Sequence, residues 1–123
     1  QEKLRQINGK KTEPNNVITF DEFQNVELKT AKVLEAEKVD SADKLLKLQV
    51  EVGDEKRQLV AGIAKFYKPE ELVGKMIVVV ANLKPATIFG LESYGMLLAA
   101  KKGKDLTLIT IDGEKVKSGM KIY

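Results

Sequence analysis

The sequence predicts an all-β fold: a small β-barrel of five strands, with one short helix between the third and fourth strands and a C-terminal hairpin extension. Residues 44–52 alternate between apolar and polar side chains, residues 76–81 are all apolar, and turn-forming residues separate these stretches from their neighbours. Alternation is typical of a strand with one buried face, and an unbroken apolar run suits a strand covered on both faces. The 123 residues, 43% of them hydrophobic, suffice for one domain with its own core.

The start of the chain differs from the rest in composition. Residues 1–17 are polar and include Pro14, so we expect a linker or flexible tail before a single domain at residues 18–123. Because the chain begins with Gln1, we expect a processed protein or a piece of a longer one. Thr19 or Asp21 could cap a short helical turn, and we expect Phe20 and Phe23 to anchor the domain entry to the core.

A long first strand is predicted over residues 26–39. Its alternation slips in phase near Thr30 and Ala31, which indicates a bulge or bend in a strand that serves two sheet faces. A turn at residues 40–43 leads to a second strand over residues 44–52. The core face of this strand carries every second residue, namely Leu46, Leu48, Val50 and Val52.

A third strand is predicted over about residues 56–63, after a turn that contains Gly53. Residues 64–74 are helical in character, with Pro69 suited to open a helix and Gly74 suited to end it. The fourth and fifth strands are predicted over residues 75–83 and 95–101, followed by another strand over 106–111 and a terminal hairpin over 116–123.

This order of three strands, a helix and two strands is that of the OB-fold, a five-stranded Greek-key barrel. Other barrels of five or six strands fit the pattern as well. In the OB-fold, the connection between strands four and five forms one rim of the ligand-binding face. Here that connection is residues 82–95, which is longer than a usual hairpin loop and carries Asn82, Lys84 and Tyr94.

Composition excludes several classes of function. The chain has no cysteine and no histidine, which excludes disulfides, zinc sites of the thiolate or imidazole type, and nucleophiles activated by histidine. Paired acids at residues 40 and 43, and at 70 and 71, are better interpreted as a turn and a helix start than as catalysts. No apolar run is long enough for a membrane span. We therefore expect no catalysis, cofactor, metal or membrane partner, and a location in the cytoplasm.

The net charge of +3 belongs largely to residues 1–17, so the predicted domain is nearly neutral. If it binds a polyanion, its lysines must gather on one face. Candidate lysines lie on the first strand, at the start of the second, and after the third, namely Lys29, Lys32, Lys44 and Lys65. Aromatic residues make up only 6%, and we expect Phe89 to fill the core. This scarcity favours folded RNA over single strands as a ligand.

Five motifs in one order carry a resemblance to a known family. They are ADKLLKL (42–48), AGIA (61–64), PEELVGK (69–75), VANLKP (80–85) and GLESYGM (90–96). Over about residues 18–123 the chain resembles the tRNA-binding domain appended to many methionyl-tRNA synthetases. The same module also occurs as a stand-alone dimeric tRNA-binding protein, and it is similar to the C-terminal domain of the endothelial monocyte-activating polypeptide and the N-terminal region of the phenylalanyl-tRNA synthetase β chain.

The resemblance implies an OB-fold that forms a homodimer and binds the body of tRNA with little preference among tRNAs. It implies a non-catalytic module, most simply the C-terminal part of a methionine–tRNA ligase. Ser93 and Met96 match family positions at the tRNA face, although Met96 could equally be a core residue. Asn82 and Lys84 open the rim, where an amide and an ammonium group suit ribose and phosphate oxygens.

The chain departs from the family pattern at two places. Residues 86–87 are Ala-Thr where many relatives carry Arg-Lys, and residues 29–31 are Lys-Thr-Ala where many carry Arg-Val-Gly. The first change removes two cations from the rim, and the second replaces a forked donor by a point charge. These departures leave open a second hypothesis, a homodimerisation or chaperone-like interaction domain with weak or lost RNA binding.

Overall fold

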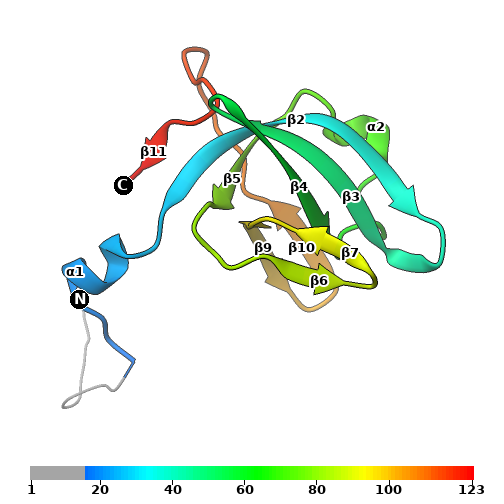
Figure 1. Ribbon diagram of the computed structural model, residues 1–123, viewed down its shortest axis with the longest axis horizontal. Helices are drawn as coiled ribbons and strands as arrows, with labels where there is room; N and C mark the ends of the chain where they lie inside the picture. The colour runs from blue at the N-terminus through cyan, green and yellow to red at the C-terminus, as the bar shows by residue number, and fades with distance from the viewer. Residues whose placement is uncertain (1–15) are drawn as a thin grey trace.

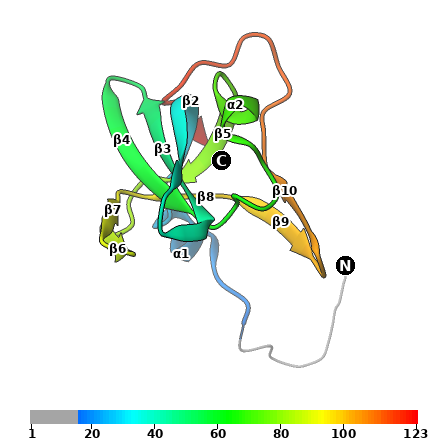
Figure 2. The ribbon, with the colours of Figure 1, turned by 90° about the vertical axis from the view of Figure 1, so that its right-hand side faces the viewer.

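A curled antiparallel sheet forms the centre of this mostly β structure (Figures 1 and 2). The computed structural model describes residues 16–123, so nearly all of the predicted linker lies outside the described residues. The main sheet has the strand order β4-β3-β2-β5-β8, and β11 also pairs with β2. Its strands are β2 (Leu28–Val39), β3 (Ala42–Val52), β4 (Glu55–Ala61), β5 (Met76–Val80), β8 (Met96–Leu97) and β11 (Lys121–Ile122).

Two small hairpins and two short helices complete the described part of the chain. The hairpins are β6 (Ala86–Ile88) with β7 (Leu91–Ser93), and β9 (Ala99–Lys102) with β10 (Asp105–Leu108). The helices are α1 (Phe20–Gln24) and α2 (Pro69–Leu72), and neither is long and apolar enough to cross a membrane.

The strand β2 holds the sheet together because it pairs with different neighbours along its length. Its first half, from Leu28 to Lys32, pairs with β5, and its second half pairs with β3. The ladder with β3 shifts register between Val33 and Glu35, slightly beyond the predicted phase slip at Thr30 and Ala31. Both residues of that slip are buried, as expected where a strand turns from one face to another.

The core draws on most strands of this sheet and follows the predicted pattern of β3. The largest fully buried side chains come from β2, β3, β4, α2 and β5, and they are Val33, Leu46, Leu48, Val50, Leu59, Leu72, Ile77 and Val79. The helix α2 begins at Pro69, as expected, but ends after four residues because Val73 leaves helical geometry and Gly74 takes a φ of +92°. It nevertheless inserts Leu72, which is completely buried.

Three predictions about the sheet were wrong. The hydrogen-bonded strands do not close into a barrel, because no ladder joins β4 to β8. The predicted fifth strand is divided at Leu98, so that β8 stays with β5 while β9 pairs with β10 outside the main sheet. The C-terminus does not form its own hairpin, because β11 pairs with β2 instead.

Thr30 explains the route of the C-terminal segment. Its backbone N–H donates to the oxygen of Met120 (2.9 Å), and its oxygen accepts from the N–H of Gly119 (2.7 Å). Its hydroxyl also accepts from the N–H of Met120 (2.9 Å) and donates to the oxygen of Lys117. This buried threonine therefore fixes the returning chain against β2 from both its backbone and its side chain.

The helix α1 was partly predicted. Thr19 caps it, since its hydroxyl accepts from the N–H of Glu22 (3.1 Å) and the Glu22 carboxylate accepts from the N–H of Thr19 (2.9 Å). The expectation that Phe20 anchors this entry to the core was wrong, because Phe20 is 69% exposed and α1 has no buried residue. Phe23 is half-buried.

Candidate nucleic-acid interface

The segment 82–95 contains a β-hairpin that sequence patterns did not reveal. β6 and β7 pair from Ala86–Ser93 to Ile88–Leu91, which leaves a two-residue turn at Phe89 and Gly90. Both turn residues have positive φ, 53° and 80°, as a type I′ turn requires. The usual sequence signal for such a turn is Asn-Gly or Asp-Gly, and Phe-Gly does not give it.

This hairpin is attached to the open edge of β4 by hydrogen bonds at residues 92–94. The N–H of Tyr94 donates to the oxygen of Gln58 (2.8 Å), and the amide of Gln58 donates to the oxygen of Glu92 (2.8 Å). The hydroxyl of Ser93 accepts from the N–H of Val60 (3.0 Å) and donates to the oxygen of Gly95 (3.0 Å). Ser93 is 3% exposed, so its hydroxyl holds backbone together instead of presenting itself to a ligand.

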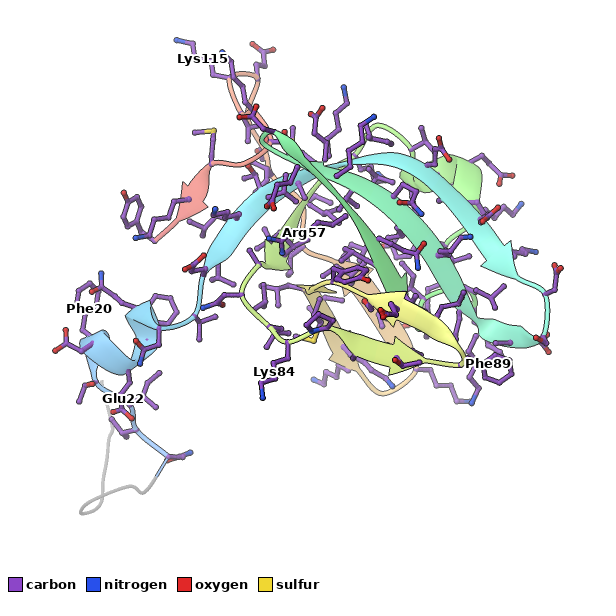
Figure 3. The ribbon with its side chains drawn as sticks, in the orientation of Figure 1. Phe20, Glu22, Arg57, Lys84, Phe89 and Lys115 are labelled. Carbon is purple, nitrogen blue, oxygen red and sulfur yellow. The ribbon has the colours of Figure 1, made fainter. Side chains whose placement is uncertain are left out.

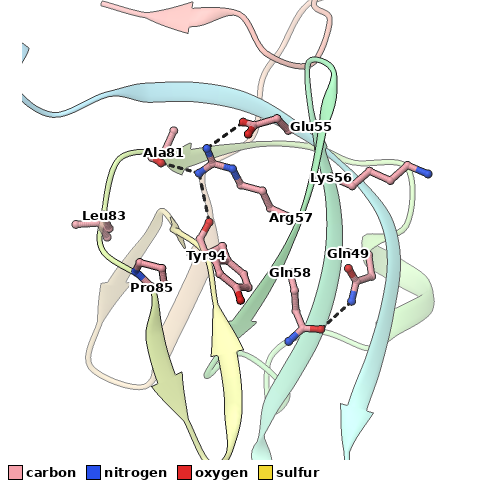
Figure 4. Close-up of a pocket in the computed structure, with 9 residues that line it drawn as sticks. All are labelled: Gln49, Glu55, Lys56, Arg57, Gln58, Ala81, Leu83, Pro85 and Tyr94. Atoms are coloured by element: carbon pink, nitrogen blue, oxygen red, sulfur yellow. Dashed lines mark hydrogen bonds and ion pairs between the residues drawn. The ribbon is translucent and has the colours of Figure 1, made fainter.

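Arg57 on β4 connects the two ends of the segment. Its Nη1 donates to the oxygen of Ala81 (2.6 Å) and to the oxygen of Tyr94 (3.4 Å), while Nη2 contacts the Glu55 carboxylate at 3.0 Å. The planar guanidinium suits this role because it offers several donors in fixed directions. Arg57 thus sets the shape of the rim from its base (Figures 3 and 4).

A cavity of about 560 Å³ opens between β4 and the segment 82–95 (Figure 4). One wall is mainly apolar, with Leu83, Pro85 and the ring of Tyr94, and another carries the paired amides of Gln49 and Gln58. The amide of Gln49 donates to the Gln58 oxygen at 3.1 Å. The remaining lining residues are Glu55, Lys56, Arg57 and Ala81. This combination of apolar, amide and cationic groups is suited to the sugar, base edges and phosphates of a nucleic acid.

Tyr94 stays a neutral phenol in this setting. Its hydroxyl donates to a carboxylate oxygen of Glu92 (2.9 Å), and this hydrogen bond, with the negative charge of Glu92, raises the pKa of Tyr94 above its ordinary value. The contact also fixes the direction of the ring, which is 41% exposed.

The two predicted residues that open the rim behave differently. The carboxamide of Asn82 accepts from the N–H of Glu27 (2.9 Å) and donates to the oxygen of Asn25 (2.7 Å), so it ties the rim to the residues that precede β2. Lys84 is exposed, and its side chain extends away from the sheet in Figure 3. Of these two, only Lys84 presents its polar group outward.

The other predicted residues do not gather on one face. Lys29 and Lys32 lie three positions apart on β2, before the register shift, so their side chains leave opposite faces of the strand. Lys32 lines a hollow with Lys117, and Lys44 lines another with Lys65. Met96 on β8 is half exposed and pairs in register with Val80 of β5.

Sequence reasoning missed two groups of candidate residues. The first is the Arg57 cavity, whose organisation depends on a contact across 24 positions that no local pattern reveals. The second is the β9–β10 hairpin, whose exposed tip carries three lysines, Lys101 and Lys102 at the end of β9 and Lys104 in the turn. The signal for this basic hairpin is the run KKGK at residues 101–104, of which only Lys101 belongs to the predicted fifth strand. Among the described residues, no group of three or more acidic side chains could hold a metal ion.

A family model described as "Putative tRNA binding domain" matches residues 28–121. The methionine–tRNA ligase of Thermotoga maritima is 63% identical over 107 residues, which are 87% of this chain and 17% of the ligase. The ligase of Methanothrix thermoacetophila is 57% identical over 106 residues, 86% of this chain and 16% of the ligase. The chain therefore spans about 17% of the length of the first of these relatives.

Solved structures show the same arrangement. A methionyl-tRNA-synthetase-related protein of Pyrococcus horikoshii superposes with a TM-score of 0.79 at 39% identity, covering 88% of this chain and 99% of that protein. The chaperone CsaA of Bacillus anthracis superposes with a TM-score of 0.79 at 28% identity, covering 87% of this chain and 99% of the chaperone.

Proposed function

Because the chain belongs to the tRNA-binding domain family, we propose that it is a non-catalytic module that binds folded tRNA for a methionine–tRNA ligase. Binding uses the shape and backbone of tRNA, with little sequence specificity. The observation that carries this proposal is the Arg57 cavity, which lies beneath the segment 82–95 and combines cations, amides and an exposed aromatic ring.

The cavity contributes groups that match an RNA backbone. Lys56 in the cavity supplies positive charge toward phosphates, and the amides of Gln49 and Gln58 can donate to and accept from ribose hydroxyls. Lys84 lies outside the cavity lining, on the exposed segment between Leu83 and Pro85, and adds a second positive charge there. We also propose Met96 and the lysines Lys29, Lys32, Lys44 and Lys65 as further contacts. Because Lys29 and Lys32 leave opposite faces of β2, they would contact separate parts of the tRNA body. The exposed lysines of the β9–β10 hairpin add further positive charge. Asn82 and Ser93 support the rim from within, because their side chains bond to backbone groups of this chain.

We propose that the fold is OB-like, with the sheet left open between β4 and β8, within a domain at residues 18–123. The strand order from β2 through β5 to β8, with α2 between β4 and β5, supports this assignment. The gap between β4 and β8 is bridged by residues 92–94, whose contacts with Gln58 and Val60 take the place of a regular ladder.

We also propose a homodimer formed by the end of the molecule that carries α1 and β11. Figure 1 places these two elements at the same end. Large apolar side chains on these elements and the residues next to them are exposed, namely Val17, Ile18, Phe20, Met120 and Tyr123. Burial against a second copy would remove this apolar surface from water.

The module would act by proximity. Holding tRNA on the same polypeptide, or in the same complex, raises its effective concentration near a catalytic site without a new catalytic contact. This role places the protein in the cytoplasm, where translation supplies its tRNA.

A second candidate function is a protein-interaction domain of chaperone type. It is favoured by the superposition with a structure named as the chaperone CsaA and by the exposed apolar end around Phe20. In that case the protein would dimerise without tRNA and would show little affinity for RNA.

Titration of the purified chain with three nucleic acids distinguishes these functions. At low salt, gel-shift titrations with tRNA, duplex DNA and single-stranded RNA should show the tightest binding to tRNA. Equal affinity for all three, or no binding to tRNA, would contradict the proposed function. Sedimentation of the chain with and without tRNA tests the second candidate, which requires a dimer that does not associate with RNA.

A further inference from the structure

Phe89 occupies a position that is unfavourable for a phenylalanine. It is the first residue of the β6–β7 turn and has a φ of +53°, in the left-handed region that bulky residues rarely adopt. Its side chain is 60% exposed, so the expectation that it fills the core was wrong. Burial therefore gives little compensation for the strained backbone.

The turn itself does not need an aromatic side chain. Two-residue turns of this type favour asparagine, aspartate or glycine at the first position, because these residues tolerate positive φ. Strained residues that packing does not require are typical of ligand-binding positions. The stability of the fold therefore does not account for a phenylalanine at position 89, and a role in binding would.

The surroundings of Phe89 indicate what it could bind. It lines a shallow hollow of about 390 Å³ together with the start of β3 and the residues after β4. The other lining residues are Ala42, Asp43, Lys44, Leu45 and Lys65. Figure 3 shows Phe89 at the far end of the hairpin from Lys84, so this hollow is distinct from the Arg57 cavity.

We propose that Phe89 is a stacking platform for one unpaired base of the bound RNA, with Lys44 and Lys65 directed to the phosphates beside that base. An exposed ring offers a face on which any base can stack, and stacking of this kind tolerates changes in sequence. Two lysines that line the same hollow as the ring match a ligand that carries a phosphate on each side of its base. Asp43 in the same hollow can accept a hydrogen bond from a base amino group.

This inference rests on the proposed function. It adds which part of the RNA the protein contacts, namely an unpaired base. A purely duplex RNA has no unpaired base, whereas the loops and the 3′ end of tRNA contain unpaired bases. The hollow would therefore make the protein favour tRNA over a blunt RNA duplex of equal charge, without a preference among tRNAs.

The Phe89→Asn variant tests the inference because asparagine suits the turn but cannot stack as phenylalanine does. We expect its melting temperature to equal or exceed that of the parent protein, while its affinity for tRNA falls about tenfold. Its affinity for a blunt RNA duplex should not change. Phe89→Tyr keeps an aromatic ring and should retain the affinity of the parent for tRNA. Val73→Asn, which removes another exposed apolar side chain, is the matched control and should bind both RNAs as the parent does.

Each outcome has a separate meaning. Undiminished tRNA binding by Phe89→Asn would overturn the stacking platform and leave the proposed function intact. Equal losses for tRNA and blunt duplex would also overturn it, because a contact with an unpaired base cannot affect the duplex. If the parent protein itself does not bind tRNA, the proposed function fails and the inference fails with it.

Discussion

The guanidinium of Arg57 donates a hydrogen bond of 2.6 Å to the backbone oxygen of Ala81, joining β4 to the first residue after β5. The acceptor is nearly buried, so water cannot fully replace the donor. Because Nη1 also reaches the oxygen of Tyr94 (3.4 Å), one side chain contacts both ends of the segment 82–95. The rim of the candidate interface therefore depends on a residue outside it.

Replacing Arg57 by lysine should separate geometry from charge. Lysine keeps the positive charge but lacks the fork, so we expect the free energy of unfolding to fall by about 1–3 kcal/mol in urea denaturation. Affinity for tRNA should fall several-fold with an unchanged salt dependence. Lys56→Met, in the same cavity, should lower the salt dependence without loss of stability. Similar stability and affinity for Arg57→Lys and the parent would show that the rim does not need this contact.

Lys84→Ala should weaken tRNA binding and flatten its dependence on salt. Each lost phosphate contact lowers the slope of log K against log salt by about 0.7–0.9. The measurement is a series of tRNA titrations between low and physiological salt. Lys115→Ala removes the same charge at the top of the view in Figure 3, away from Lys84, and should leave the slope unchanged. Identical slopes for Lys84→Ala and the parent would exclude Lys84 as a phosphate ligand.

Leu72→Ala should reduce the free energy of unfolding by about 2–5 kcal/mol, because it leaves a cavity in the core. Leu72 is completely buried although α2 has only four residues. The adjacent Val73 is half exposed, so Val73→Ala should change stability by less than about 0.5 kcal/mol. If Leu72→Ala lowered the free energy of unfolding as little as Val73→Ala does, α2 would not be needed to close the core.

Gly119→Ala should detach the C-terminal segment from the β3–β4 turn. A Cβ at Gly119 would lie 2.6 Å from the Cα of Gly53, and Gly119 has a φ of +84°. We expect a loss of more than about 1 kcal/mol in the free energy of unfolding. Gly113→Ala is the control, since a Cβ there would meet nothing within 4 Å. Equal melting temperatures for the two variants would contradict the close approach of the two backbones.

Phe20→Glu should convert the proposed homodimer into a monomer, because a charge would be buried against the second copy. Analytical ultracentrifugation gives the molecular mass directly, and circular dichroism checks that the monomer remains folded. Val73→Glu introduces the same charge at another exposed apolar position and should leave the dimer intact. A dimer that persists in Phe20→Glu would place the interface elsewhere.

Local patterns predicted the elements whose burial repeats along the chain. Leu46, Leu48 and Val50 alternate with half-exposed residues, and all three are buried as expected. The division at Leu98 was not predictable in this way, because it depends on partners far away: its N–H bonds to Val78, and its oxygen accepts from Ile109. An apolar sequence continues across this point, but the hydrogen-bonding partners change.

The candidate site was predicted less completely than the fold. The segment 82–95 was identified from its length and its polar groups, and it does line the Arg57 cavity. The roles of its residues were not predictable from their types, since a serine hydroxyl or an asparagine amide suits RNA and backbone equally well. Only tertiary contacts show that Ser93 bonds to Val60 and Asn82 to Glu27.

The most direct test of tRNA binding by this face is to map the backbone amide shifts of ¹⁵N-labelled protein during titration with tRNA. We predict that the largest changes fall on β4 at residues 55–58 and on the segment 82–95, which together line the Arg57 cavity. The amides of α1 and β11, at the proposed dimer interface, should change little. Changes confined to that end of the molecule, or none at saturating tRNA, would contradict the assignment of this face as the tRNA-binding surface.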